Sequence, residues 1–112
     1  MGQGETLQKE TGESTDKIVK LRWTLPAVEQ LHGIFEYIAD DNAAAALRTV
    51  ERIRLSIRQA SRMPYAGRMG RVAGTREVIV PGTSYIVAYR VLDDAVHVLA
   101  ILHGAQKWPE SF

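Results

Sequence analysis

The sequence predicts an α+β protein in which a helical hairpin packs on an antiparallel sheet, with the element order β-α-α-β-β-β. Three observations lead to this prediction. Residues 26–62 place apolar side chains at three- and four-residue spacing, which is typical of helices. Residues 75–103 place β-branched and aromatic residues in short runs between turn signals, which is typical of strands. The chain has 112 residues, 46% of them hydrophobic and 24% charged, which is enough for one soluble domain.

We divide the chain into a flexible polar tail, residues 1–16, and one folded domain, residues 17–112. Apart from Met1, the tail has one large apolar residue, Leu7, so it cannot bury enough surface to offset the entropy lost on ordering. Residues 18–23 follow as a predicted short strand, because β-branched and aromatic side chains lie there around two bases.

Two helices are predicted after this strand. The first spans residues 26–39 and begins at Pro26, whose fixed φ suits a first helical turn. Its predicted core stripe consists of Val28, Leu31, Phe35 and Ile38. Asp40-Asp41-Asn42 then interrupts the pattern with helix-capping side chains, and the second helix starts at Ala43. The core stripe of that helix consists of Ala46, Val50, Ile53, Ile57 and Ala60. Because so few residues join the helices, we expect an antiparallel hairpin.

Three strands are predicted at residues 75–80, 84–92 and 95–103, after a glycine-punctuated loop at residues 64–74. Pro81-Gly82 and Asp93-Asp94 separate the strands, and both breaks have the length of a hairpin turn, so we expect an antiparallel meander. A two-residue turn at Asp93-Asp94 implies three cross-strand pairs: Leu92 with Ala95, Arg90 with His97, and Ser84 with His103.

Charge is distributed unevenly along the chain. The net charge of +1 excludes a protein that coats nucleic acid by cationic excess alone. Residues 1–47, however, carry 4 bases and 8 acids, residues 48–76 carry 8 arginines and one acid, and residues 77–112 carry 2 bases and 4 acids. The arginines of the second helix occupy an arc of roughly 160°; they are Arg48, Arg52, Arg54, Arg58 and Arg62. This basic middle favours an anionic partner, and a solvated helix face with a basic loop is the alternative.

Several kinds of site are excluded by residue chemistry. The chain has no cysteine, so disulfides, thiolate zinc sites and cysteine nucleophiles are absent. The histidines His32, His97 and His103 have no carboxylate in register, so we expect no metal. The segment from Gly67 to Arg71 lacks the Gly-Lys-Ser/Thr ending of a phosphate loop, so we expect no cofactor there. With neither an apolar leader nor an apolar run of membrane-spanning length, we expect a cytoplasmic protein.

The remaining polar residues give no convincing active centre. His97 beside Arg90 is assigned a packing role, whereas His103 at a strand end is more open to function. Glu77 next to Arg76 is interpreted as part of a neighbouring ion pair, not as a general base. Tyr85 and Tyr89 alternate with valines in the pattern of a core strand.

Five motifs occur in a fixed order: Met63-Pro64 after the hairpin, PYAGRMG at 64–70, GTRE at 74–77, YIVAYRV at 85–91 and ILHGAQ at 101–106. Together they resemble the RelE/ParE superfamily of bacterial type II toxin–antitoxin toxins, over residues 18–109. The resemblance implies the RelE/ParE toxin fold, a role in growth inhibition, and a cognate antitoxin protein as partner. Operator DNA would be contacted only through that antitoxin.

The superfamily contains two activities. RelE-type members resemble ribosome-dependent endoribonucleases, and at the places where they carry lysine or arginine this chain has Glu77, Ile79, Ile86 and Gln106. An isoleucine can neither stabilise a phosphate nor transfer a proton. The ending Ile-Leu-His-Gly looks like ParE-type members, which inhibit DNA gyrase without chemistry of their own. The resemblance therefore favours a gyrase inhibitor, with an mRNA endoribonuclease acting at the ribosome as the alternative.

The resemblance and the charge pattern together give a set of target- or antitoxin-binding residues. Anionic contacts are assigned to Arg68, Arg71, Arg76 and Arg90, and the exposed toxic surface to Lys107 and Trp108, with His103 beside them. In the nuclease alternative, a phosphate site would consist of Arg76, Arg90, His103 and Lys107. Two structural alternatives also stand: Arg76 pairs only with Glu77 or Asp93, or Trp108 closes the core as a lid. A non-toxic binding module is the third functional possibility.

Overall fold

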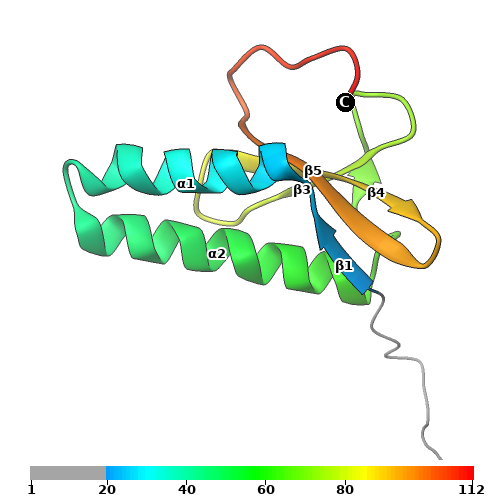
Figure 1. Cartoon of the computed structure of the whole chain (residues 1–112), viewed down its shortest axis with the longest axis horizontal. Coiled ribbons are helices and arrows are strands. Elements are labelled where there is room, and N and C mark those ends of the chain that lie inside the picture. Colours follow the sequence, from blue (N-terminus) through cyan, green and yellow to red (C-terminus); the bar gives the residue numbers. More distant parts are fainter. Residues whose placement is uncertain (1–19) are drawn as a thin grey trace, which may run out of the picture.

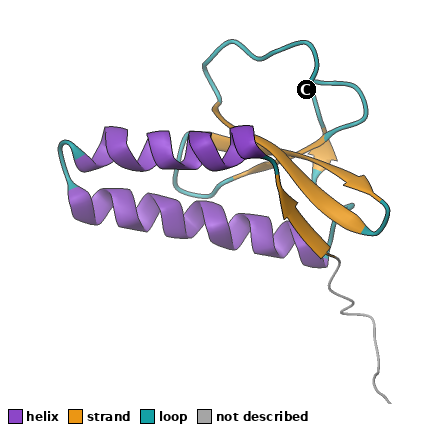
Figure 2. Ribbon diagram, in the orientation of Figure 1, coloured by secondary structure: helices purple, strands orange, loops and turns teal. Residues whose placement is uncertain are grey.

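The computed structural model describes residues 20–112 and has two helices packed on one face of a five-stranded mixed sheet (Figure 1; Figure 2). The elements are β1 (Lys20–Trp23), α1 (Leu25–Ala39), α2 (Ala43–Arg62), β2 (Arg68–Met69), β3 (Arg76–Ile79), β4 (Tyr85–Leu92) and β5 (Ala95–His103). The α+β class and the helical hairpin are thus confirmed. The predicted tail and residues 18–19 of the first strand lie outside the described residues. Within residues 20–112, no helix has the length and apolar character needed to span a membrane.

Polar caps define where the two helices begin. The Thr24 hydroxyl accepts the Ala27 N–H at 3.4 Å and donates to the Val98 carbonyl at 2.7 Å, which ties the start of α1 to β5. The Asn42 side chain accepts the Ala45 N–H at 3.0 Å and caps α2. The helix α1 therefore begins one residue before the predicted Pro26, and the connection between the helices lies where the capping residues predicted it.

The core lies between the hairpin and the sheet, and its centre consists of Leu31, Ile53, Ile57, Val87, Val98 and Ile101. The predicted stripe of α2 is confirmed, since four of its members are buried and Val50 is partly buried. The predicted stripe of α1 is confirmed at Leu31. On either side of it, Ala27 and Ile34 contact the core in place of the predicted Val28 and Phe35, which lie one residue further along. Because α1 packs against both α2 and β5, its buried face is turned toward the sheet, and spacing alone could not define that rotation.

The sheet has the strand order β1-β5-β4-β3-β2. Strands β2 to β5 are antiparallel to their neighbours, whereas β1 pairs with β5 in parallel at the other edge. The two-residue strand β2 lies in the segment predicted to be a loop. At the β4–β5 turn, Asp93 and Asp94 have φ values of 52° and 60°, as a two-residue hairpin requires.

The register of β4 and β5 agrees with the prediction only near this turn. Arg90 lies opposite His97, as predicted, but His103 lies opposite Tyr85 and not Ser84. The difference arises from a bulge beside Ala88 and Tyr89, where β5 contains one extra residue, Leu99, that has no partner in β4. An insertion of this kind shifts every pair beyond it by one residue.

The bulge also determines which face of the sheet each side chain of β5 lies on. The face under the helices carries Tyr85, Val87, Tyr89, Val98 and Ile101. We call the other face, which neither α1 nor α2 covers, the open face; it carries Glu77, Ile79, Ile86, Ala88, Ala100 and Leu102. Arg90 and His97 lie on the open face nearer the β4–β5 turn. Candidate functional groups therefore divide between two opposite surfaces.

A prediction follows for the tight loop between β2 and β3. The Gly70 N–H donates to the Thr75 carbonyl at 2.8 Å, and an added Cβ would lie 2.9 Å from that oxygen and collide with the Thr75 hydroxyl. We expect Gly70→Ala to lower the free energy of unfolding by about 1–3 kcal/mol, because this backbone cannot move away. Urea unfolding measures the change. Gly33→Ala is the control: its Cβ would meet no atom within 4 Å, so on α1 it should stabilise by up to about 1 kcal/mol.

Candidate functional site

Glu77 is the centre of a charged cluster on the open face. Its side chain is 1% exposed. The Arg68 guanidinium donates to Oε1 from Nε at 3.2 Å and from the terminal nitrogen at 3.0 Å. The Arg71 N–H donates to Oε2 at 2.7 Å, and the Arg71 Nε lies 3.7 Å from the same oxygen. A buried carboxylate needs such compensation, so this cluster holds the loop after β2 against β3.

Arg71 connects this cluster to the C-terminal segment. Its guanidinium lies 4.0 Å from the centroid of the Trp108 ring, in the geometry of a cation–π contact. Trp108 in turn packs on Ala88, Ala100 and Leu102. The tryptophan is thus half-buried rather than exposed, and it covers the open face as the lid interpretation expects. Lys107, next to it, is exposed.

The other predicted site residues lie elsewhere. Arg76 is on the helix side of β3, where its guanidinium donates to the carbonyls of Gly67 at 2.8 Å and Tyr65 at 3.2 Å and lies 5.1 Å from the Tyr65 ring. It therefore pairs with neither Glu77 nor Asp93. Arg90 is on the open face, and its Nε lies 3.4 Å from the Gly74 carbonyl oxygen.

His103 ends β5 on the helix side. Its ring contacts the Tyr85 ring edge to face, with centroids 5.7 Å apart. Seven residues were predicted as one set, and the structure brings only Arg68, Arg71 and Trp108 together. Arg76 and His103 lie on one face of the sheet and Arg90 on the other, so these three cannot surround one small ligand.

The Arg71–Trp108 contact gives a second prediction. We expect Trp108→Ala to lower the free energy of unfolding by about 2 kcal/mol, because it uncovers three apolar residues of the open face and removes the cation–π contact. Thermal and urea unfolding measure the loss. Trp108→Phe, which keeps an aromatic ring for Arg71, should lose less than half as much. Equal losses for both variants would show that the aromatic contact contributes nothing.

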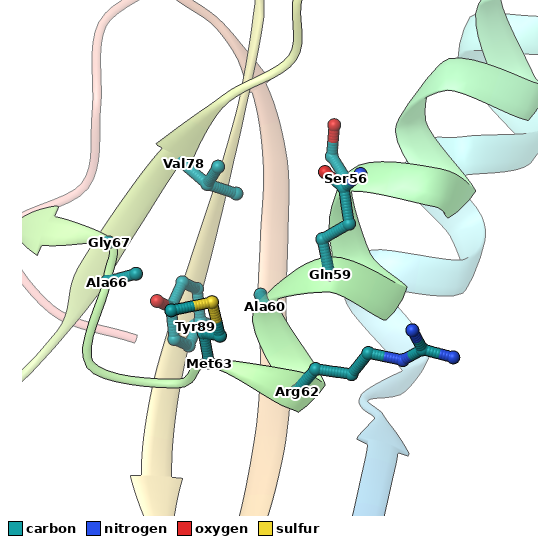
Figure 3. A pocket seen from close by; sticks show the side chains of 9 residues that line it. All are labelled: Ser56, Gln59, Ala60, Arg62, Met63, Ala66, Gly67, Val78 and Tyr89. Carbon is teal, nitrogen blue, oxygen red and sulfur yellow. The ribbon is translucent and has the colours of Figure 1, made fainter. Parts of the chain in front are cut away.

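A groove lies along α2 on the other side of the molecule. Two adjoining hollows of about 400 and about 380 Å³ share Ser56 and Gln59 and make up this α2 groove. Its apolar lining consists of Leu55, Ala60, Met63, Val78, Pro81 and Tyr89. Figure 3 shows Met63 and Tyr89 on the loop side of the first hollow and Arg62 extending away from Tyr89. Leu55 and Met63 are 49% and 66% exposed, so the groove offers apolar contacts to a partner.

A hydrogen bond fixes Tyr89 in the lining of the groove, and two arginines also line it. The Tyr89 hydroxyl donates to the Pro64 carbonyl at 2.9 Å and fixes the loop after α2. Burial raises the pKa of Tyr89, although a backbone hydrogen bond at Gly67 and the charge of Arg76 oppose the shift, so the hydroxyl stays a donor at neutral pH. Arg52 and Arg62 line the two hollows, and no acidic side chain among residues 20–112 lines either one. The α2 groove therefore suits an apolar segment with negative charges.

Sequence reasoning missed the two central features of these surfaces. Glu77 was assigned to an ion pair, but its partners are Arg68 and Arg71, nine and six residues earlier, and not the adjacent Arg76. The only local signal was that Glu77 directly precedes Val78, which packs against the core. The α2 groove had no signal beyond the arginine-rich second helix, because its floor comes from β3 and β4.

The chain is similar to known toxins in sequence and in fold. Residues 21–108 match the family model described as ParE toxin of type II toxin–antitoxin system, parDE. The chain is 38% identical over 91 residues to the toxin homologue Y4kP of Sinorhizobium fredii, covering 81% of this chain and 94% of that protein. It is 31% identical over 84 residues to toxin RelE2 of Caulobacter vibrioides, covering 75% and 93%.

Two solved structures have the same fold. One is the chromosomal ParDE toxin–antitoxin system from P. aeruginosa, with a TM-score of 0.70 and 24% identity over 77% of this chain and 96% of that chain. The other is the toxin–antitoxin complex RelBE2 from Mycobacterium tuberculosis, with a TM-score of 0.54 and 26% identity over 78% and 99%.

Proposed function

This chain belongs to the RelE/ParE superfamily of toxins from type II toxin–antitoxin systems, and on that premise we propose that it is a ParE-like inhibitor of DNA gyrase. It would trap gyrase on cleaved DNA, block replication, and be neutralised by a cognate antitoxin. This proposal makes the protein a binding toxin with no chemistry of its own.

The replaced basic positions carry the proposal. Four positions at which RelE-type members have basic residues are occupied here by other groups. Glu77 is buried and paired with two arginines, and Ile79 lies opposite Ile86. The Gln106 side-chain oxygen accepts the His103 N–H at 2.8 Å. None of the four can donate a positive charge to a phosphate in a transition state, which supports action by docking over action by cleavage.

The nuclease alternative depends on substitute residues. Arg76, Arg90, His103 and Lys107 would have to form one phosphate site. Arg76 already donates to two backbone carbonyls, and Arg90 lies on the opposite face of the sheet from Arg76 and His103. This separation also supports the gyrase proposal.

We place the antitoxin in the α2 groove. A helical segment with apolar residues at three- and four-residue spacing would contact Leu55, Met63 and Tyr89. Its acidic residues would approach the arginines of α2, of which Arg52 and Arg62 line the groove. The antitoxin would be encoded beside this gene and would itself carry the contacts to operator DNA.

Two assays on purified protein test the proposal in parallel. Supercoiling by gyrase should fall as the chain is added and recover when the antitoxin is added. Translation-coupled cleavage of mRNA should stay at background under the same conditions. Cleavage of mRNA with intact supercoiling would make the chain a ribosome-dependent nuclease. Normal growth on expression without antitoxin would instead indicate a non-toxic binding module.

A further inference from the structure

The two helices of the hairpin carry opposite charge. Helix α1 has two glutamates, Glu29 and Glu36, and neither arginine nor lysine, whereas α2 has five arginines and one glutamate. All of these side chains are exposed. Among residues 20–112, every ion pair within 4 Å involves Glu77, so the helix charges have no ionic partner in the described part of the chain. They therefore remain available to another molecule.

These charges point away from the sheet. At about 100° per residue, Glu29 and Glu36 lie about 160° and about 140° around α1 from Leu31, which is buried in the core. On α2, Arg48 lies about 140° from the buried Ile53. We call this outward side of the two helices the hairpin face. Its exposed residues include Leu25, Glu29, Glu36, Arg48, Arg54 and Leu55.

Apolar side chains accompany the charges of the hairpin face. Leu25 on α1 is 67% exposed, and Leu55 on α2 is 49% exposed. A partner that covered these leucines would gain the apolar contribution that exposed ion pairs alone do not supply. Of the six residues named for the hairpin face, Leu55 alone also lines the α2 groove, so this surface differs from the proposed antitoxin site.

Opposite groups of the two helices lie level with each other. The helices run antiparallel, side by side, with Ala39 ending α1 and Ala43 beginning α2 (Figure 1). Each step along α1 away from Ala39 therefore corresponds to one step along α2 away from Ala43. By this count, three pairs lie within two residues, or about 3 Å, of the same level. They are Glu29 with Arg54, Glu36 with Arg48, and Leu25 with Leu55.

We infer that the hairpin face binds a second copy of this chain about a two-fold axis parallel to the helices. This rotation keeps every residue at its own level and places α1 of each copy on α2 of the other. Each of the three pairs then forms twice across the interface, between the acidic helix of one copy and the basic helix of the other. A two-fold axis perpendicular to the helices would instead place α2 on α2 and bring like charges together. The association does not depend on gyrase inhibition.

Sedimentation equilibrium of the purified chain tests the inference without gyrase or antitoxin. We expect the mean mass to rise from 12.5 kDa toward twice that value, with a Kd on the order of 10–100 μM, as for a small transient interface. Raising the salt concentration from about 0.05 to about 0.5 M should weaken association at least about fivefold, because salt screens exposed charges. A monomer at every concentration up to about 1 mM, or association that salt does not weaken, would overturn the inference.

Two charge-reversal variants identify the pairs. One combines Glu29→Arg with Glu36→Arg, and the other combines Arg48→Glu with Arg54→Glu. Each alone should associate at least about 20-fold more weakly, because like charges then meet. An equimolar mixture should recover a Kd within about threefold of the original, because the basic helices of one variant meet the acidic helices of the other.

The mixture also separates this arrangement from its alternatives. Without recovery, the charges would act within one chain, and the inference would be overturned. Species larger than a dimer would show head-to-tail contacts and would overturn the two-fold arrangement.

Matched controls lie outside the hairpin face. Lys107→Glu and Glu110→Arg change exposed charges of the C-terminal segment, and each should leave the Kd within about twofold of the original. Leu25→Ser should weaken association at least about fivefold through lost apolar contact, whereas Leu92→Ser, at a leucine 50% exposed at the end of β4, should not. Circular dichroism checks that each variant is folded. Equal effects of hairpin-face and control variants would refute the site.

Discussion

Glu77→Gln is expected to lower the free energy of unfolding by about 2–3 kcal/mol, as measured by urea denaturation. The variant keeps the shape of the side chain and an oxygen for the Arg71 N–H, so the loss reports the missing charge. Without that charge, Arg68 and Arg71 both lie beside a residue that is 1% exposed and no longer compensates them. Removing one partner of a buried ion pair leaves the charge of the other partner uncompensated. Because the two arginines are half-exposed, we expect a loss of stability at the lower end of the usual range.

Two controls separate this effect from charge removal in general. Glu51→Gln removes an exposed carboxylate from α2 and should change stability by less than about 0.5 kcal/mol. Arg68→Gln leaves Arg71 to compensate Glu77 and should cost about 1 kcal/mol, since its side chain is 50% exposed. If Glu77→Gln is no more destabilising than Glu51→Gln, the cluster does not stabilise the fold.

Local sequence signals were sufficient for most of the fold. Asn42 marked the start of α2, the aspartate pair marked the β4–β5 turn, and the apolar spacing of α2 marked its buried face. Each of these features depends on residues within a few positions of one another. The failures depend on distant segments: the rotation of α1 is set by β5, and the register beyond Tyr89 is set by the bulge at Leu99.

The candidate sites were less predictable for the same reason. Arg68 and Arg71 were selected for their positive charge, but the buried Glu77 of β3 compensates much of that charge. Trp108 had two interpretations, and only the packing of the C-terminal segment on the open face distinguishes them. Arg76 and Glu77 are adjacent in the chain, yet alternation along β3 sends them to opposite faces. Charge counted along a sequence therefore overstates the charge that a surface presents.

Met63→Glu is expected to weaken antitoxin binding at least about 100-fold, as measured by calorimetry with the antitoxin encoded beside this gene. Met63 lines the α2 groove beside Tyr89 and is 66% exposed, so the fold should tolerate a charge there while a docked apolar segment should not (Figure 3). The new carboxylate would be buried without a partner and would repel the acidic residues of the antitoxin. Inhibition of gyrase should persist, so the antitoxin should no longer restore growth.

Leu92→Glu is the matched control, because Leu92 is an apolar residue 50% exposed at the end of β4 and is not part of the groove. It should leave the antitoxin Kd within about twofold of the original. Loss of antitoxin binding in both variants would indicate a general effect of added negative charge on an acidic partner. Full binding by Met63→Glu would move the antitoxin away from α2. Loss of gyrase inhibition in Met63→Glu alone would mean that antitoxin and target share the groove, and neutralisation would then be direct competition.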